Sequence, residues 1–194
     1  MALFGCAHNR GMSGTLPPIL LLQEQILAHP GKRIVDALQL LDDPVRLLLA
    51  PNAKPLDAHL ATFPFDAEGN LVFDAMRREL MDDYLGEALR LMHNLVAAVG
   101  TVIDQTRIVL EANWPDPANL VRVRFADALR RFRGDGRLLV VRDLRTYMLH
   151  LRLPGISGTL GLGPNGLETS SVNLICASLL EWSGWRPAAR TYLR

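Results

Sequence analysis

Apolar side chains recur at steps of mostly three and four residues from about Leu71 to Asn113, and this is the strongest pattern in the chain. The series is Met76, Leu80, Leu85, Leu89, Met92, Val96, Val99 and Ile103. Such spacing predicts an amphipathic α-helix. A straight helix of that length would extend about 65 Å, which is long for a domain of this size. We therefore expect a kink or break near Gly86 or Gly100.

The segment before this helix predicts shorter elements. Residues 19–28 and 33–49 have the pattern of two helices separated by Pro30 and Gly31. Pro44 should begin a new turn or bend the second helix, because a proline inside a helix removes a hydrogen bond. The stretch from Pro51 to Asn70 contains several prolines and ends in Gly-Asn, which predicts a connecting loop.

Two further helices are expected after the long one. Residues 118–133 predict an amphipathic helix with an arginine-rich face, and the turn Gly134-Asp135-Gly136 separates it from the next helix. Pro154-Gly155 ends that helix.

The last part of the chain predicts two strands followed by short helices. Short alternating segments from Ile156 to Val172, on either side of Pro164-Asn165-Gly166, predict a β-hairpin. Residues 161–166 also match the letters G-x-G-x-x-G, but a dinucleotide fingerprint must connect a strand to a helix, so the hairpin is favoured. The tail predicts one helix to about Trp182 and a short one near Pro187. Its large aromatic residues are expected to anchor these helices to the core, and they are Trp182, Trp185 and Tyr192.

Together these elements predict a mainly α protein: a helical bundle with a long central helix and a small β-hairpin near the C-terminus. Residues 1–70 are expected to form an N-terminal arm and short helices that pack on the bundle, and residues 71–194 the helical domain itself. With 194 residues, of which 49% are hydrophobic, the chain can fill one core.

The overall charge excludes two classes of protein, while its distribution is uneven. The 21 basic and 20 acidic residues nearly cancel, which argues against a nucleic-acid-coating protein and against an acidic disordered one. Residues 66–87 are mainly acidic, whereas residues 120–154 hold nine arginines against three aspartates. The chain is therefore acidic first and basic afterwards.

Cysteine usage and hydropathy predict a cytoplasmic protein without a membrane span. Cys6 and Cys176 are far apart and have no metal-ligand spacing, so neither a disulfide framework nor a metal site is indicated. No stretch approaches the roughly 20 apolar residues of a membrane helix. We expect no cofactor.

The segment Arg142–Pro154, RDLRTYMLHLRLP, carries the candidate chemistry. Arg145 and His150 are five residues apart, about 140° around a helix, but the long arginine and the helix end before Pro154 would let both side chains reach one cleft. Histidine transfers protons near neutral pH, and a guanidinium binds phosphate oxygens in pairs. Together they could hold and cleave a phosphodiester without a metal.

A second interpretation explains the same charges without catalysis. The apolar residues of this helix would face the core, and they are Leu144, Tyr147, Met148 and Leu151. Arg142, Arg145 and Arg152 would then cap the helix or pair with carboxylates of the acidic long helix.

The segment Arg145-Thr146-Tyr147-Met148-Leu149-His150 resembles the motif of the HEPN (higher eukaryotes and prokaryotes nucleotide-binding) family, an arginine followed after four to six residues by histidine. The resemblance covers about residues 71–193 and is greatest to bacterial members. It implies a helical bundle that forms a homodimer in which two motifs meet. Active members are metal-independent endoribonucleases, often toxins or effectors of phage defence.

Carried over to this chain, the resemblance gives Arg145 and His150 catalytic roles: Arg145 would stabilise the scissile phosphate and His150 would transfer a proton. Neighbouring candidates for contact with RNA are Arg142, Thr146, Tyr147 and Arg152. The leading hypothesis is an HEPN-like RNA-binding protein with endoribonuclease activity, of a toxin–antitoxin or phage-defence type. The alternative is a non-catalytic HEPN-like dimerisation or interaction module that docks on an acidic protein partner or antitoxin.

Overall fold

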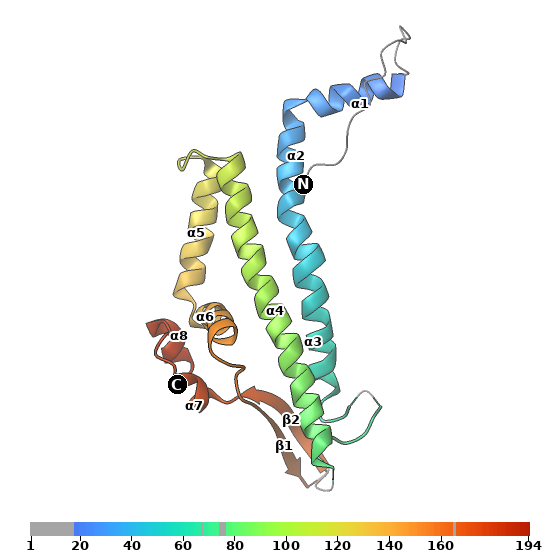
Figure 1. The fold of residues 1–194 in the computed structure, drawn as a ribbon, viewed down its shortest axis with the longest axis vertical. Helices are drawn as coiled ribbons and strands as arrows, with labels where there is room; N and C mark the ends of the chain where they lie inside the picture. The colour runs from blue at the N-terminus through green and yellow to red at the C-terminus, as the bar shows by residue number, and fades with distance from the viewer. Residues whose placement is uncertain (1–17, 67, 74–76, 165) are drawn as a thin grey trace. The chain divides into compact units, whose positions relative to one another are not determined.

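The computed structural model describes most of the chain, which divides into two compact units, residues 1–38 and 39–194. The described residues are 18–66, 68–73, 77–164 and 166–194. In the first unit they comprise helix α1 (Pro18–Ala28) and the beginning of α2 (Pro30–Pro44) (Figure 1). Each helix begins at a proline, whose missing N–H would have no partner in a first turn. The apolar side chains of α1 are largely exposed.

The second unit begins with the end of α2, followed by a π-helical turn, η1 (Val45–Leu49), and by α3 (Ala50–Thr62). The change of helix type comes directly after Pro44, in agreement with the prediction that this proline begins a new turn. π-Helical turns are rare and appear mostly as single turns inside longer helices.

The loop predicted from Pro51 to Asn70 is wrong over most of its length, because residues 50–62 are helical. Pro51 lies in the first turn of α3, where its lost N–H costs little, whereas Pro55 lies inside the helix. Packing of α3 along α4 supplies the stabilisation that outweighs this unfavourable residue. The chain leaves the helix only at Phe63, which is buried.

Helix α4 (Arg78–Asn113) confirms the long central helix but runs uninterrupted through Gly86 and Gly100, so the predicted break is wrong. At about 1.5 Å per residue it extends roughly 54 Å. It remains continuous because other elements pack on different parts of it: η1 and α3 along one side, and α6 on another (Figure 1).

Helices α5 (Leu120–Gly134) and α6 (Gly136–His150) form as predicted from their apolar spacing. Each has a side-chain cap: Asn119 Oδ1 accepts a hydrogen bond from Val121 N, and Asp135 Oδ1 accepts one from Arg137 N, both at 2.9 Å. α5 runs back alongside α4 in the opposite direction, and α6 then crosses next to α4 (Figure 1).

The predicted hairpin is confirmed as strands β1 (Ile156–Gly163) and β2 (Gly166–Leu174), paired antiparallel with Gly163 opposite Gly166. Asn165 lies outside the described residues. The glycines of the G-x-G-x-x-G match therefore stand in two adjacent strands and not between a strand and a helix, as the hairpin interpretation requires.

The C-terminal helices α7 (Cys176–Leu180) and α8 (Pro187–Tyr192) close the main core. The buried side chains of this core are Val96, Leu139, Val140, Leu144, Tyr147, Met148, Leu179, Trp185, Ala189 and Leu193. Trp185 anchors the tail as predicted, and Trp182 packs edge-on against Tyr147 with 5.7 Å between ring centroids. The prediction for Tyr192 is wrong, since 59% of it is exposed.

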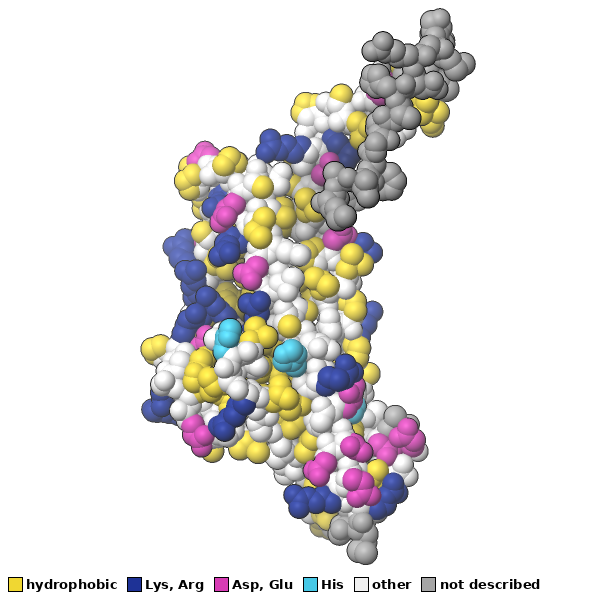
Figure 2. Space-filling view, viewed as in Figure 1, with side chains coloured by type: hydrophobic (Ala, Val, Ile, Leu, Met, Phe, Trp, Pro, Cys, Tyr) yellow, Lys and Arg dark blue, Asp and Glu magenta, His cyan; other side chains and the backbone are white. Residues whose placement is uncertain are grey.

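The protein is thus mainly helical with a small antiparallel hairpin near the C-terminus, as the sequence predicts. Within the described part of the chain, no helix combines the length and the apolar character that crossing a membrane requires. Surface charge within the second unit follows the sequence. In Figure 2, Lys and Arg side chains gather over α5 and its junction with α6, and acidic side chains gather near the start of α4.

Candidate anion-binding site

A cavity of about 330 Å³ lies among α4, α5 and α6. Five arginines line it: Arg107, Arg133, Arg142, Arg145 and Arg186. They come from α4, α5, α6 and the residue before α8, so only the folded chain brings them together. We call this cavity the arginine pocket.

Arg145 enters the pocket across the surface of α4. Its Nη1 lies 3.7 Å from Asp104 Oδ2 on that helix. Its Nε is buried and forms no hydrogen bond with a described residue. The guanidinium can approach α4 so closely because Gly100 has no side chain: a Cβ added there would lie 2.6 Å from Arg145 Cζ. Gly100 thus provides the space for Arg145.

Arg186 is held in the pocket by a buried carboxylate. Asp143 of α6 is 4% exposed, and its Oδ2 accepts a hydrogen bond from the backbone N–H of Arg186 at 2.9 Å. Asp143 Oδ1 lies 3.1 Å from Arg186 Nη1, although Nη1 itself is buried and has no hydrogen bond to a described residue. Asp143 therefore fixes the start of the α8 segment and the position of its arginine.

The remaining three arginines add positive charge to the pocket, which Asp143 and Asp104 offset in part near Arg142. Arg107, Arg133 and Arg142 form no ion pair with any residue that the structure describes. Partial burial lowers the pKa of Arg142, and the neighbouring charges of Arg186 and Arg133 lower it further. A bound anion would offset the repulsion among these like charges.

Apart from Asp104 and Thr146, the rest of the pocket wall is apolar. Side chains from α4 and α5 supply it, namely Val96, Val99, Ile103, Phe125, Leu129 and Phe132, and α6 adds Val141. A cavity that combines apolar and aromatic walls with a few charged groups is typical of a site for a ligand with an acidic group and an apolar body.

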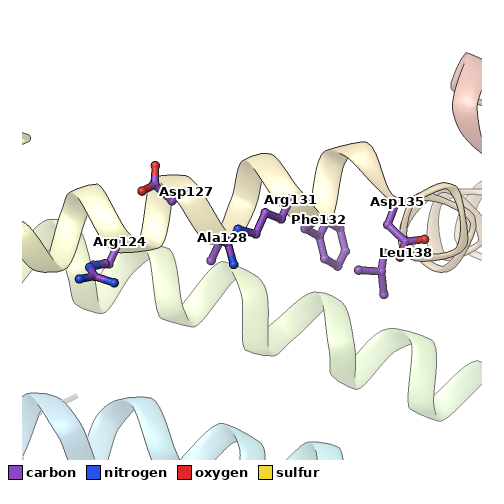
Figure 3. Close-up of a pocket in the computed structure, with 7 residues that line it drawn as sticks. All are labelled: Arg124, Asp127, Ala128, Arg131, Phe132, Asp135 and Leu138. Carbon is purple, nitrogen blue, oxygen red and sulfur yellow. The ribbon is translucent and has the colours of Figure 1, made fainter.

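A second, shallower hollow lies on the neighbouring face of α5 (Figure 3). Arg124 and Arg131 line it, and Phe132 lines both this hollow and the arginine pocket. Figure 3 shows Phe132 beside Leu138 at one end of the hollow. Neither Arg124 nor Arg131 is ion-paired to a described residue. Asp127 and Asp135 line this hollow as well, but they pair with Arg130 and Arg137, so positive charge continues from the arginine pocket over α5.

The structure brings together some of the predicted site residues. Arg142, Arg145 and Thr146 all line the arginine pocket. His150, the last residue of α6, is exposed and does not line it. Within one chain, the two residues proposed for catalysis therefore do not share this cavity.

The other two predicted contacts also lie away from the arginine pocket: Tyr147 is on the core side of α6, and Arg152 is an exposed residue just after that helix. Tyr147 is fully buried, and its ring stacks on Trp185 with 6.0 Å between centroids. Its hydroxyl accepts a hydrogen bond from Arg152 Nε at 2.8 Å, and Arg152 Nη2 donates to Glu181 Oε2, also at 2.8 Å. In the folded chain this pair connects α6 to the end of α7.

Sequence reasoning missed Gly100, Arg107, Asp104 and Arg186 as parts of one site. From the sequence, Gly100 predicts only a point where the helix could bend. Arg186 lies 41 residues after Arg145 in the sequence, and no local spacing relates the two. The only usable signal was the excess of arginine in residues 120–154, which includes Arg133 and the α6 arginines.

Comparison with protein-family models, curated proteins and solved structures finds no match to this chain. The resemblance of the segment Arg145–His150 to the HEPN motif therefore stays a prediction from the sequence. What the protein does is accordingly inferred from the geometry of the arginine pocket.

Proposed function

We propose that this protein binds RNA and that the arginine pocket holds one of its phosphate groups. The observation that carries the proposal is the convergence of five arginines on one pocket, in which the buried Nε of Arg145 has no hydrogen bond within the described residues. Leaving a buried charged donor unsatisfied costs free energy, about 1–3 kcal/mol or more. A phosphate group supplies several strong acceptor oxygens, and a guanidinium fork matches their geometry.

The walls and surroundings of the pocket favour RNA over a small inorganic anion. Phe125 and Phe132 offer aromatic faces next to the arginines, and base stacking on aromatic side chains is a general means of binding single strands. The arginines Arg124 and Arg131 extend the positive surface beyond the pocket. A positively charged path beside aromatic groups fits a flexible polyanion.

The non-catalytic interaction module is the second candidate function, and one observation favours it. Arg145 pairs with Asp104 of α4, as that interpretation predicts for a basic helix that docks on a carboxylate. An acidic segment of another protein could take the place of Asp104 in the same way. In that case the arginine pocket would bind carboxylates, and RNA would be a poor ligand.

Cleavage of RNA is a further step that the geometry of one chain does not favour, because His150 lies outside the pocket that contains Arg145. In the HEPN resemblance, two motifs meet across a homodimer, so a second copy would have to bring the imidazole to the bound phosphate. The proposal of endoribonuclease activity therefore depends on dimerisation, whereas the proposal of RNA binding does not.

Binding of a short single-stranded RNA over a salt series tests the proposed function. We expect affinity to fall steeply with salt, because phosphate contacts release counterions. Arg142→Gln should weaken binding and flatten the salt slope by about one contact. Arg90→Gln is the matched control, since Arg90 is an exposed arginine of α4 that pairs with Glu87 outside the pocket.

A polyglutamate peptide measured in the same assay separates the two candidate functions. RNA binding that exceeds polyglutamate binding and is lost in Arg142→Gln supports the proposal. Polyglutamate bound more tightly than RNA would support the interaction module instead. No binding of RNA at low salt would refute the proposed function.

Cleavage is tested with purified protein in chelator, by comparison of the wild type with Arg145→Ala and His150→Ala. Loss of activity in both variants, with RNA binding retained in His150→Ala, would support the nuclease proposal. Wild-type cleavage no stronger than that of the variants would end it. Sedimentation of the same samples shows whether activity follows the dimer.

A further inference from the structure

The arginine pocket contains more positive charge than an internal phosphate of RNA needs. Five guanidinium groups line it, whereas two carboxylates, Asp104 and Asp143, lie against them. An internal phosphodiester carries a single negative charge. A terminal phosphate monoester carries about −1.5 to −2 at pH 7 and offers three strong acceptor oxygens. Since Coulomb energy scales with ligand charge, the monoester gains more in this pocket.

The number and position of the hydrogen-bond donors also favour a phosphate monoester. The buried Nε of Arg145 has no hydrogen bond to a described residue, and Arg186, from another part of the fold, brings a guanidinium whose Nη1 lies 3.1 Å from Asp143 Oδ1. Arg142 and Arg133 add two guanidinium groups that form no ion pair with a described carboxylate. Donors that approach from several sides suit a tetrahedral group with three terminal oxygens, while two oxygens of a diester are taken up by the continuing chain.

The size of the pocket limits how much RNA it can hold. About 330 Å³ lies at the lower end of the range of roughly 300–1,000 Å³ for small-molecule sites. Three helices wall the cavity, and Phe125, Leu129 and Ile103 supply an apolar surface beside the arginines. This space suits one nucleotide, with its base against the apolar wall and its phosphate among the arginines. The terminal nucleotide of an RNA fits such a pocket, because the strand has to leave the pocket on one side only.

From charge, donors and size together, we infer that the arginine pocket binds a terminal phosphate monoester of RNA in preference to an internal phosphodiester. This inference rests on the proposed function and names its ligand more narrowly. The second hollow, with Arg124 and Arg131, would then contact internal phosphates of the same strand.

The test compares one short single-stranded RNA in three forms: with a 5′-phosphate, with a 3′-phosphate, and with hydroxyls at both ends. We expect at least one phosphorylated form to bind about tenfold more tightly than the hydroxyl form. Arg142→Gln should remove most of this difference, and Arg90→Gln should keep it. Arg142 is exposed and unpaired with described residues, so its replacement should leave the fold intact, which thermal melting checks.

Competition with a nucleoside monophosphate and with inorganic phosphate distinguishes the sources of the phosphate group. Displacement of phosphorylated RNA by the monophosphate, and less by inorganic phosphate, supports a site for phosphate plus base. Equal binding of all three RNA forms would overturn the inference but leave the proposed RNA binding in place. Binding of the monophosphate without binding of any RNA would overturn both.

Discussion

The absent side chain of Gly100 in α4 provides the space in which the guanidinium of Arg145 from α6 lies. A Cβ at position 100 would come within 2.6 Å of Arg145 Cζ, well inside van der Waals contact. Gly86 stands on the same helix, and a Cβ there would have no neighbour within 4 Å. One glycine of α4 therefore shapes the candidate site, and the other has no such role.

Gly100→Ala should weaken binding of RNA about tenfold or more, because Arg145 must leave its place against α4 and a charge-assisted hydrogen bond is lost. The fold should survive, since the atoms that clash belong to a flexible side chain. Gly86→Ala is the matched control and should raise helix stability by up to about 1 kcal/mol without changing affinity. Titration of labelled RNA measures both. Equal affinity in the two variants would show that Arg145 does not contribute.

Asp104→Asn should strengthen RNA binding about two- to fivefold. Asp104 Oδ2 lies 3.7 Å from Arg145 Nη1, so it competes with an incoming phosphate for the same guanidinium. The side chains of both residues are partly exposed, and pairs of this kind contribute about 0.2–1 kcal/mol. Asp83→Asn, an exposed position of α4 outside the pocket, controls for the change in net charge. An equal gain in both variants would indicate a long-range charge effect only.

Asp143→Ala should destabilise the protein by about 1–3 kcal/mol, because the backbone N–H of Arg186 loses its acceptor. Asp143→Asn should cost less, since its amide oxygen can still accept that hydrogen bond. Both variants remove the negative charge that holds the side chain of Arg186, so both should also weaken RNA binding. Denaturant unfolding gives the stabilities, and a larger loss in Asp143→Asn than in Asp143→Ala would contradict this account.

Tyr147→Phe should lower stability by about 0.5–1.5 kcal/mol and leave RNA affinity unchanged. The hydroxyl accepts a hydrogen bond from Arg152 Nε, and the ring is buried in the core, away from the arginine pocket. Thermal melting and RNA titration of one preparation measure the two effects. A loss of RNA affinity with unchanged stability would instead support the contact role predicted from the sequence.

Asp135→Asn should reduce the loss of stability that accompanies acidification. The side chain of Arg137 lowers the pKa of Asp135, and the Arg137 backbone N–H lowers it further. A carboxylate whose folded-state pKa is below its unfolded value of about 3.9 stabilises the fold above that value. This contribution is lost as pH falls through the folded pKa. Unfolding measured from pH 7 to pH 3 should therefore show a shallower decline in the variant than in the wild type.

How far the fold follows from the sequence differs between elements. The apolar spacing predicted α4, α5 and α6, and turn residues such as Gly134-Asp135-Gly136 predicted where α6 begins. These signals are local, since they reflect side chains three or four residues apart. The helix over residues 50–62 was missed because Pro55 is unfavourable there by itself, and only packing against α4 stabilises it.

The candidate site was likewise predicted only in part from the sequence. The sequence singled out Arg142, Arg145 and Thr146, which do line one pocket. The sequence also predicted that His150 and Tyr147 belong to the same site, because they stand in the same short motif. Around a helix, adjacent residues point in different directions, so Tyr147 lies in the core and His150 lies outside the pocket.

By itself, the sequence determined the helical class, the long central helix, the hairpin and the basic character of residues 120–154, since each depends on residues close together in the chain. Only the folded chain brings Arg107, Arg145 and Arg186 to one cavity, in which Gly100 leaves the space that Arg145 occupies. The physical reason is that charge converges only where separate helices pack, and the packing of α4 against α6 depends on contacts between residues distant in sequence.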